Sequence, residues 1–211
     1  MYEVVRTGQY YAIVCDGKPV RSPLGKPHFT AFRWLAEDLR DDFNRFGPSP
    51  PGAISLVTLH SAYLDYAANV PRRLLESDLL SRYDPAMDFA LDRPQDRTAE
   101  AMLTVWFGPV LPCEQLSAWL RAASTRQLVS MTMAADVTSS ALIAYRVMAG
   151  ELPASRLAAG VRKWGCGRPH TVEALTAILE RVRRYAEVPD ETELLVAFPT
   201  PGPAAQGIPW R

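Results

Sequence analysis

The sequence predicts an α+β protein, in which a small antiparallel β-rich domain with one helix precedes an all-helical domain. Residues 10–30 hold two turn signals between short runs rich in aromatic and β-branched residues. From Ala31 onward, apolar residues instead recur every three or four positions, which is the period of an amphipathic helix. The run "PSPPG" separates the two regions, because consecutive prolines remove backbone donors and disfavour helical geometry. We therefore expect domains at 1–50 and 51–198, followed by a proline-rich extended tail at 199–211.

The β-rich domain is predicted from its turns. Asp16-Gly17 is typical of a type I′ hairpin turn, which needs positive φ at both central positions. The flanking runs "YYAIV" and "PVRS", the second beginning at Pro19, can pair across it. Pro23-Leu24-Gly25 then predicts a second turn, because proline sets φ and glycine tolerates a left-handed conformation. The sheet should end near Phe29 or Thr30.

The helices are predicted from apolar spacing and from their end signals. Residues 31–46 form the first, with Gly47 as its stop. The run 125–148 is either one long helix or two, and Gly150 suits a left-handed cap at its end. The other expected helices cover residues 55–66, 71–83, 98–107, 113–123, 153–163 and 170–186.

Composition excludes several classes of function. The 211 residues carry 23 basic and 23 acidic side chains, so no net charge favours a nucleic acid or an anionic membrane. No apolar run approaches the roughly 20 residues of a membrane span. Three separated cysteines and the lack of a signal-like segment favour a cytoplasmic protein, which we expect to be a monomer.

Catalytic and cofactor motifs are missing from the sequence. It contains no P-loop, GxGxxG, GxSxG or HExxH, so no cofactor is expected. Cys166 and His170 lie four residues apart but have no second ligand pair, and no metal is expected either. A small enzyme with a ligand cleft between the two domains stays possible, with Asp65, Asp78 or His60 as acid or base. A further alternative is an adaptor that docks through residues 199–211.

Several runs of the sequence share a pattern with a known family. They are "DGKPVRSPLGKP" at 16–27, Leu35-Ala36, "ISLVTLHSAYLD" at 54–65, "ESDLLSRY" at 76–83, and "LVSMTMAADVTSSALIAYRVMAGELPASRLAAGVRKWG" at 128–165. Together they resemble the family of F1-ATPase assembly chaperones that handle the α subunit of ATP synthase in mitochondria and α-proteobacteria. The resemblance covers roughly residues 10–187. The motif residues that carry it include Asp16, Gly17, Pro19, Pro23, Gly25, Asp65 and Asp78.

The resemblance implies a non-enzymatic protein that binds the free F1 α subunit and shields its apolar interface until the β subunit replaces it. One departure concerns the surroundings of Trp164-Gly165, where the family carries acidic residues and this chain has Gly160, Arg162 and Arg168. Interfaces are anchored by a few aromatic and arginine side chains. The candidates for partner binding are therefore Trp164, Arg162, Arg168, Trp34 and Trp119.

Overall fold

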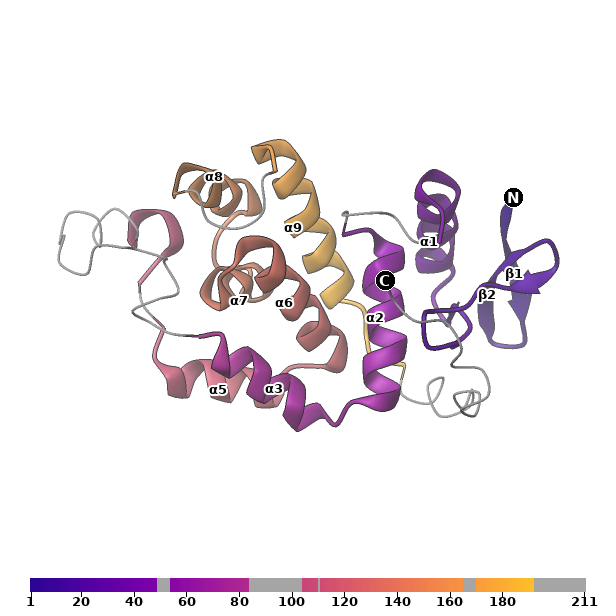
Figure 1. Cartoon of the computed structure of the whole chain (residues 1–211), viewed down its shortest axis with the longest axis horizontal. Coiled ribbons are helices and arrows are strands. Elements are labelled where there is room, and N and C mark those ends of the chain that lie inside the picture. The colour runs from indigo at the N-terminus through magenta and orange to yellow at the C-terminus, as the bar shows by residue number, and fades with distance from the viewer. Residues whose placement is uncertain (49–53, 84–103, 110, 165–169, 192–211) are drawn as a thin grey trace. The chain divides into compact units, whose positions relative to one another are not determined.

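The computed structural model describes residues 1–48, 54–83, 104–109, 111–164 and 170–191 (Figure 1). The chain divides into two compact units. Unit 1 comprises Met1–Val70 and Asp190–Arg211, of which Asp190 and Glu191 are described in the second segment, and unit 2 comprises Pro71–Pro189. Unit 1 contains the antiparallel strands and unit 2 is helical, so the predicted α+β class is confirmed.

The division between the units follows Val70, whereas the sequence suggested a boundary near residue 50. Most of the "PSPPG" break and the whole of the predicted tail at 199–211 lie outside the described residues.

The sheet of unit 1 contains β1 (Tyr2–Thr7), β2 (Tyr10–Cys15), β3 (Lys18–Pro19) and β4 (Phe29–Thr30). The order is β1-β2-β3, and β4 also pairs with β2. The predicted hairpin is confirmed, because Cys15 pairs with Lys18 across Asp16 (φ 51°) and Gly17 (φ 74°). The sequence located the sheet only from Tyr10 onward, so β1 was not predicted.

Two helices pack with this sheet in unit 1. The first, α1 (Arg33–Phe46), buries Leu35, Ala36, Leu39 and Phe43, and ends at Gly47 (φ 75°). The second is α2 (Leu56–Asn69), where the Ser55 side chain accepts a hydrogen bond from the Thr58 amide as the N-cap. Glu191 joins the second segment of unit 1 to the first. Its carboxylate accepts a hydrogen bond from the Thr30 hydroxyl at 3.0 Å, and its amide donates to the Tyr63 hydroxyl oxygen at 2.7 Å.

Unit 2 contains α3 (Arg72–Ser81), α5 (Cys113–Ala122), α6 (Thr125–Thr138), α7 (Ala141–Ala149), α8 (Ala154–Trp164) and α9 (Val172–Ala186), with a further helical turn at residues 104–107. Of the two possibilities for residues 125–148, the structure shows two helices. The break follows from Ser139, whose left-handed conformation (φ 55°) ends α6, and from Ser140, whose side chain caps α7. Gly150 has the predicted left-handed conformation (φ 67°) after α7.

Candidate functional site

Helix α8 carries the residues that the sequence singled out for partner binding. It buries Leu157, Ala158 and Val161, and its last turn exposes Arg162 and Lys163. Trp164 is the last residue of the helix, and its side chain is outside the described part of the structure, as is the whole of Arg168. Of the predicted residues in this region, Arg162 is the one whose side chain the structure describes, and it is exposed.

The helical turn 104–107 packs against α8, a contact that no local sequence pattern indicates. Phe107 is fully buried, and it lies so close to Gly160 that a Cβ there would be 2.6 Å from Phe107 Cε1. Glycine at this position therefore has a structural reason, because any side chain would meet the phenyl ring.

Polar and aromatic contacts extend the packing between this turn and α8. The Lys163 ammonium lies 5.3 Å from the centre of the Trp106 ring, within cation–π range, and Arg156 donates to the carbonyl oxygen of Val105. Val105 is 63% exposed. We call Val105, Trp106, Arg156, Arg162 and Lys163 the α8 surface. It combines exposed apolar area with cations, which are the residue types of an interface anchor.

The two remaining tryptophans named from the sequence lie elsewhere. Trp119 on α5 is half-buried, and its ring stands edge-on to Tyr145 of α7 at 5.6 Å. That contact makes Trp119 a packing residue between two helices. Trp34 belongs to α1 in unit 1, where it is 40% exposed and its ring centre lies 6.5 Å from that of Phe32.

The second predicted turn is held by a carboxylate on α2. Gly25 (φ 86°) follows Pro23 and Leu24, and its amide bonds to the Ser22 carbonyl oxygen at 2.9 Å. Asp65 accepts from the Ser22 hydroxyl at 2.5 Å and from the Leu24 amide at 3.2 Å. Burial raises the pKa of Asp65, although both hydrogen bonds and Lys26 oppose the rise. The Asp65 side chain therefore has a positioning role in the fold.

Two histidines are part of the core of unit 1. His28 is buried and its pKa is lowered to about 3 by desolvation, while its Nε2 lies 3.2 Å from the Ser61 hydroxyl. The Nε2 of His60 lies 3.0 Å from the carbonyl oxygen of Phe29, and His60 is fully buried. His60 is therefore a hydrogen-bonded residue of the core.

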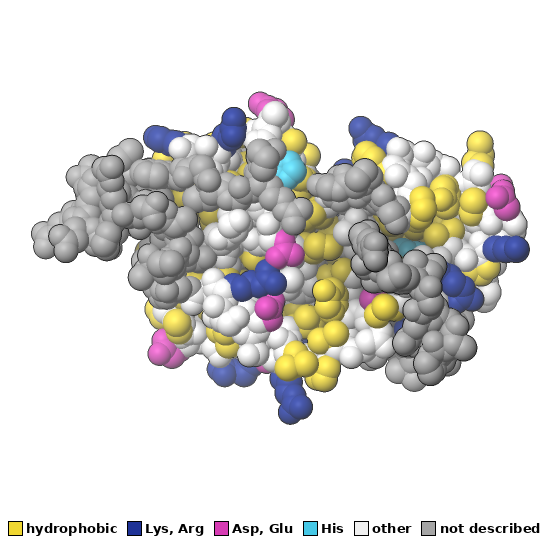
Figure 2. Space-filling view, viewed as in Figure 1, with side chains coloured by type: hydrophobic (Ala, Val, Ile, Leu, Met, Phe, Trp, Pro, Cys, Tyr) yellow, Lys and Arg dark blue, Asp and Glu magenta, His cyan; other side chains and the backbone are white. Residues whose placement is uncertain are grey.

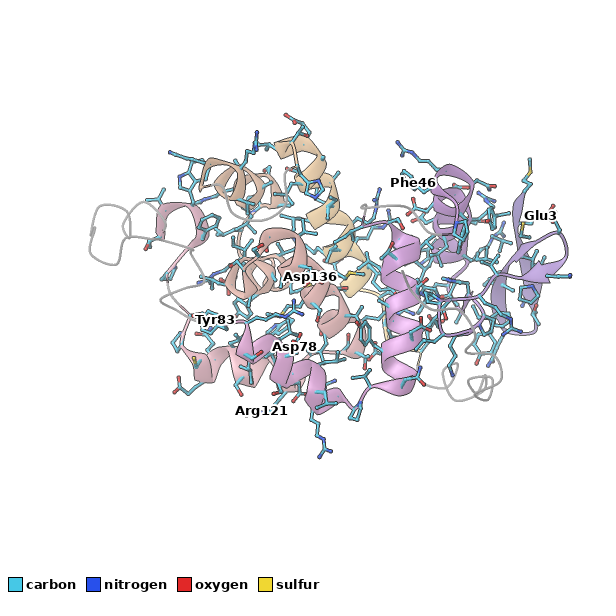
Figure 3. The ribbon with its side chains drawn as sticks, in the orientation of Figure 1. Glu3, Phe46, Asp78, Tyr83, Arg121 and Asp136 are labelled. Atoms are coloured by element: carbon cyan, nitrogen blue, oxygen red, sulfur yellow. The ribbon has the colours of Figure 1, made fainter. Side chains whose placement is uncertain are left out.

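Arg82 forms a small ionic cluster in unit 2, with Asp78 on α3 and Asp136 on α6. Figure 3 labels the two aspartates. The distances from the Arg82 guanidinium are 2.9 Å to Asp78 and 2.5 Å to Asp136. Arg82 and Asp136 line a pocket of about 430 Å³ together with Ser139 and Ser140. Asp78 pairs with Arg82, which also pairs with Asp136, so the Asp78 carboxylate has a structural role in joining α3 to α6.

Charged side chains of both signs are interspersed on the face of the molecule seen in Figure 2. Within the described ranges, no group of three or more His, Cys, Asp or Glu residues is arranged to hold a metal ion. None of the helices described has both the length and the hydrophobicity needed to cross a membrane. Cys15 and Cys113 are free thiols.

Two solved structures share this fold. Atu1473 from Agrobacterium tumefaciens, a candidate chaperone, is 18% identical over 92% of this chain and 83% of its own, with a TM-score of 0.54. A point mutant of Atp12p from P. denitrificans is 16% identical over 92% of this chain and 95% of its own, with a TM-score of 0.55. No family model and no curated protein sequence matches the chain. The fold implied by the resemblance in the sequence is thus confirmed, and the chain has the fold of Atu1473 and Atp12p.

Proposed function

We propose that this protein is an assembly chaperone that binds the free α subunit of F1-ATPase and shields its apolar interface until the β subunit replaces it. The observation that carries the proposal is the match of 92% of the chain to Atp12p, whose structure it shares at a TM-score of 0.55. A second chaperone candidate, Atu1473, has the same fold. Such a protein acts by binding, because a free subunit exposes a patch that aggregates unless it is covered.

The α8 surface is the proposed client contact in unit 2. It offers the half-buried Trp106, the exposed Val105 and the cations Arg156, Arg162 and Lys163. Trp164, at the end of the same helix, and Arg168 complete this proposal. A contact of this composition would join apolar burial to charge-assisted hydrogen bonds, as interface anchors commonly do.

The three residues named as acid or base for the enzyme alternative each have a structural partner. Asp65 is bonded to the turn at Ser22, Asp78 to Arg82, and His60 to the Phe29 carbonyl. Asp65 and His60 belong to unit 1 and Asp78 to unit 2. Each of these residues is accounted for by local packing.

The test is suppression of aggregation. Purified F1 α subunit is brought to aggregating conditions with increasing amounts of the protein, and light scattering is followed. We expect suppression near equimolar ratio, weakened in Trp164→Ala and Arg162→Glu. The matched control is Arg73→Glu, which reverses an exposed charge on α3 in the same unit. Undiminished scattering at several-fold excess of the unmutated protein would contradict the proposed function.

A further inference from the structure

Strand β1 has one partner and one open edge among the described residues. It pairs with β2 from Tyr2 opposite Cys15 to Thr7 opposite Tyr10, and no described strand pairs with its other side. An edge of this kind presents backbone N–H and C=O groups to which another extended chain can bond. Figure 1 shows β1 and β2 side by side in unit 1.

The backbone groups at this open edge can be identified. The Ile13 amide bonds to the His28 carbonyl oxygen at 3.0 Å, and the Ile13 carbonyl oxygen accepts from the Val20 amide at 2.8 Å, so both groups face away from β1. Val4 lies opposite Ile13. In an antiparallel ladder, opposite residues either bond each other or both face outward. Val4 and, two residues on, Arg6 therefore turn their backbone groups to the open edge.

At Tyr2, helix α1 already occupies the outward backbone groups of β1. Asn44 Oδ1 accepts from the Tyr2 amide at 3.1 Å, and Asn44 Nδ2 donates to the Tyr2 carbonyl oxygen at 3.2 Å. The side-chain amide thus makes the pair of bonds that an adjacent strand would make at this residue. The edge left for another chain is the stretch at Val4 and Arg6.

A groove of about 760 Å³ adjoins this edge. β1 and β2 contribute one wall, and one stripe of α1 formed by Arg33, Glu37, Arg40 and Asn44 contributes the other. In Figure 3, the labels Glu3 and Phe46 mark β1 and the end of α1, two of the elements that line this groove. Tyr2 stacks on Phe43 of α1 at 5.0 Å, so the alternate residues Val4 and Arg6 also direct their side chains to the α1 face of the sheet.

The charge of the groove selects among possible occupants. Its lining contains the arginines Arg6, Arg33 and Arg40 and the glutamates Glu3 and Glu37, an excess of one positive charge. Arg33 pairs with Glu37 at 2.8 Å and Arg40 with Asp41 at 2.6 Å, both near the surface, so an acidic segment would compete for these two arginines. If two β1 edges paired antiparallel, the outward-facing residues of one copy would lie opposite the outward-facing residues of the other. Arg6 of the second copy would then point to the same side of the sheet as this groove, where it would meet further arginines. A strand with acidic side chains at alternate positions meets the opposite sign and is favoured.

We propose that the open edge of β1 binds an extended segment of a partner polypeptide by strand addition, with acidic side chains of that segment directed toward Arg6, Arg33 and Arg40. The segment carries a backbone N–H, and hence no proline, where it faces Val4 and Arg6. This inference rests on the proposed chaperone function, in which the partner is the client.

Residue-resolved amide hydrogen exchange tests the inference, with purified F1 α subunit as the probe. Alone, the Val4 and Arg6 amides should exchange fast, whereas those of Glu3, Val5 and Thr7 in the β1–β2 ladder should be protected. On addition of the α subunit we expect the Val4 and Arg6 amides to become at least about tenfold slower. Protection that instead grows with the protein's own concentration would show a second copy at the edge and would overturn the assigned occupant.

Variants at the same edge provide the matched comparison. Val4→Pro removes an outward N–H while leaving the β1–β2 bonds intact, and Val4→Thr keeps that N–H. We expect Val4→Pro to weaken α-subunit binding about 3- to 10-fold and Val4→Thr to leave it unchanged. Asn44→Ala frees the Tyr2 backbone and should tighten binding, while Arg6→Glu should weaken it. Circular dichroism and thermal unfolding establish that each variant is folded.

The failure of this inference can be distinguished from that of the proposed function. If the α subunit binds but the Val4 and Arg6 amides stay unprotected and Val4→Pro binds normally, strand addition is wrong and the chaperone function stands. If the unmutated protein neither binds the α subunit nor suppresses its aggregation, the proposed function is wrong, and the assigned occupant falls with it.

Discussion

Ser22 donates its hydroxyl to the carboxylate of Asp65, with 2.5 Å between Ser22 Oγ and Asp65 Oδ1 across 43 residues of sequence. Asp65 also accepts from the Leu24 amide, and the Ser22 oxygen accepts from the amide of Lys26 at 3.0 Å. The Asp65 side chain on α2 therefore holds Ser22 and the middle of the three-residue loop at Pro23–Gly25, and Ser22 in turn bonds the amide that follows the loop. Two of the sequence motifs, at 16–27 and 54–65, meet in this single contact.

Asp65→Asn should change how stability depends on pH. Because burial raises the pKa of Asp65, the folded protein keeps this proton at pH values where the unfolded chain, with a carboxyl pKa of about 4, has lost it. The stability from this group is full below pH ~4 and is lost as the pH rises through the raised pKa. Urea unfolding between pH 3 and 8 should show the wild type losing stability relative to Asp65→Asn, by about 1.4 kcal/mol per unit of raised pKa. Parallel curves would contradict this expectation.

His28 should make the protein sensitive to acid. Its pKa is lowered to about 3 in the folded protein, whereas an unfolded histidine has a pKa of about 6.5, so the unfolded chain binds the extra proton between these values. Stability from this group is present above pH ~6.5 and is lost as the pH falls, by up to about 1.4 kcal/mol per pH unit. We expect His28→Gln to flatten the unfolding free energy between pH 6 and 4, measured with urea. The exposed-charge variant Arg73→Gln should retain the wild-type slope.

Gly160→Ala should destabilise unit 2 through a clash with Phe107. The added Cβ would lie 2.6 Å from the ring of Phe107, which is fully buried, so the ring or the helix would have to shift. Overpacking of this kind costs about 1–3 kcal/mol, to be measured by denaturant unfolding. The double variant Gly160→Ala/Phe107→Leu should recover part of the loss. If Gly160→Ala is as stable as the wild type, the helical turn at 104–107 does not pack on α8 as described.

Arg72→Gln should loosen the contact between α3 and α5. The Arg72 guanidinium donates to the carbonyl oxygens of Leu120 at 2.8 Å, Arg121 at 3.1 Å and Ala123 at 2.5 Å, at the end of α5. It thereby satisfies groups that a helix C-terminus leaves unpaired, and it places a cation at the negative end of the dipole. We expect a loss of about 1.5–3 kcal/mol in thermal or urea unfolding. The neighbouring exposed Arg73→Gln is the control and should change stability by less than about 0.5 kcal/mol.

Local chemistry determined those features of the fold that the sequence predicted correctly. The left-handed backbone at Asp16-Gly17 can be predicted because few residues tolerate it, and the helix α1 can be predicted because its apolar spacing follows the helical period. Arg162, a candidate for partner binding, is exposed on α8, and its role in binding stays a prediction.

Contacts between distant residues were decided only by the tertiary structure. The strand β1 exists because β2 pairs with it, and the return of Glu191 to Thr30 and Tyr63 joins residues more than 100 positions apart. The fit of Gly160 against Phe107, the burial of His28 and the open edge at Val4 and Arg6 likewise depend on neighbours that no local pattern specifies. Turn and helix propensities act within a few residues, whereas burial and pairing depend on the whole packed chain.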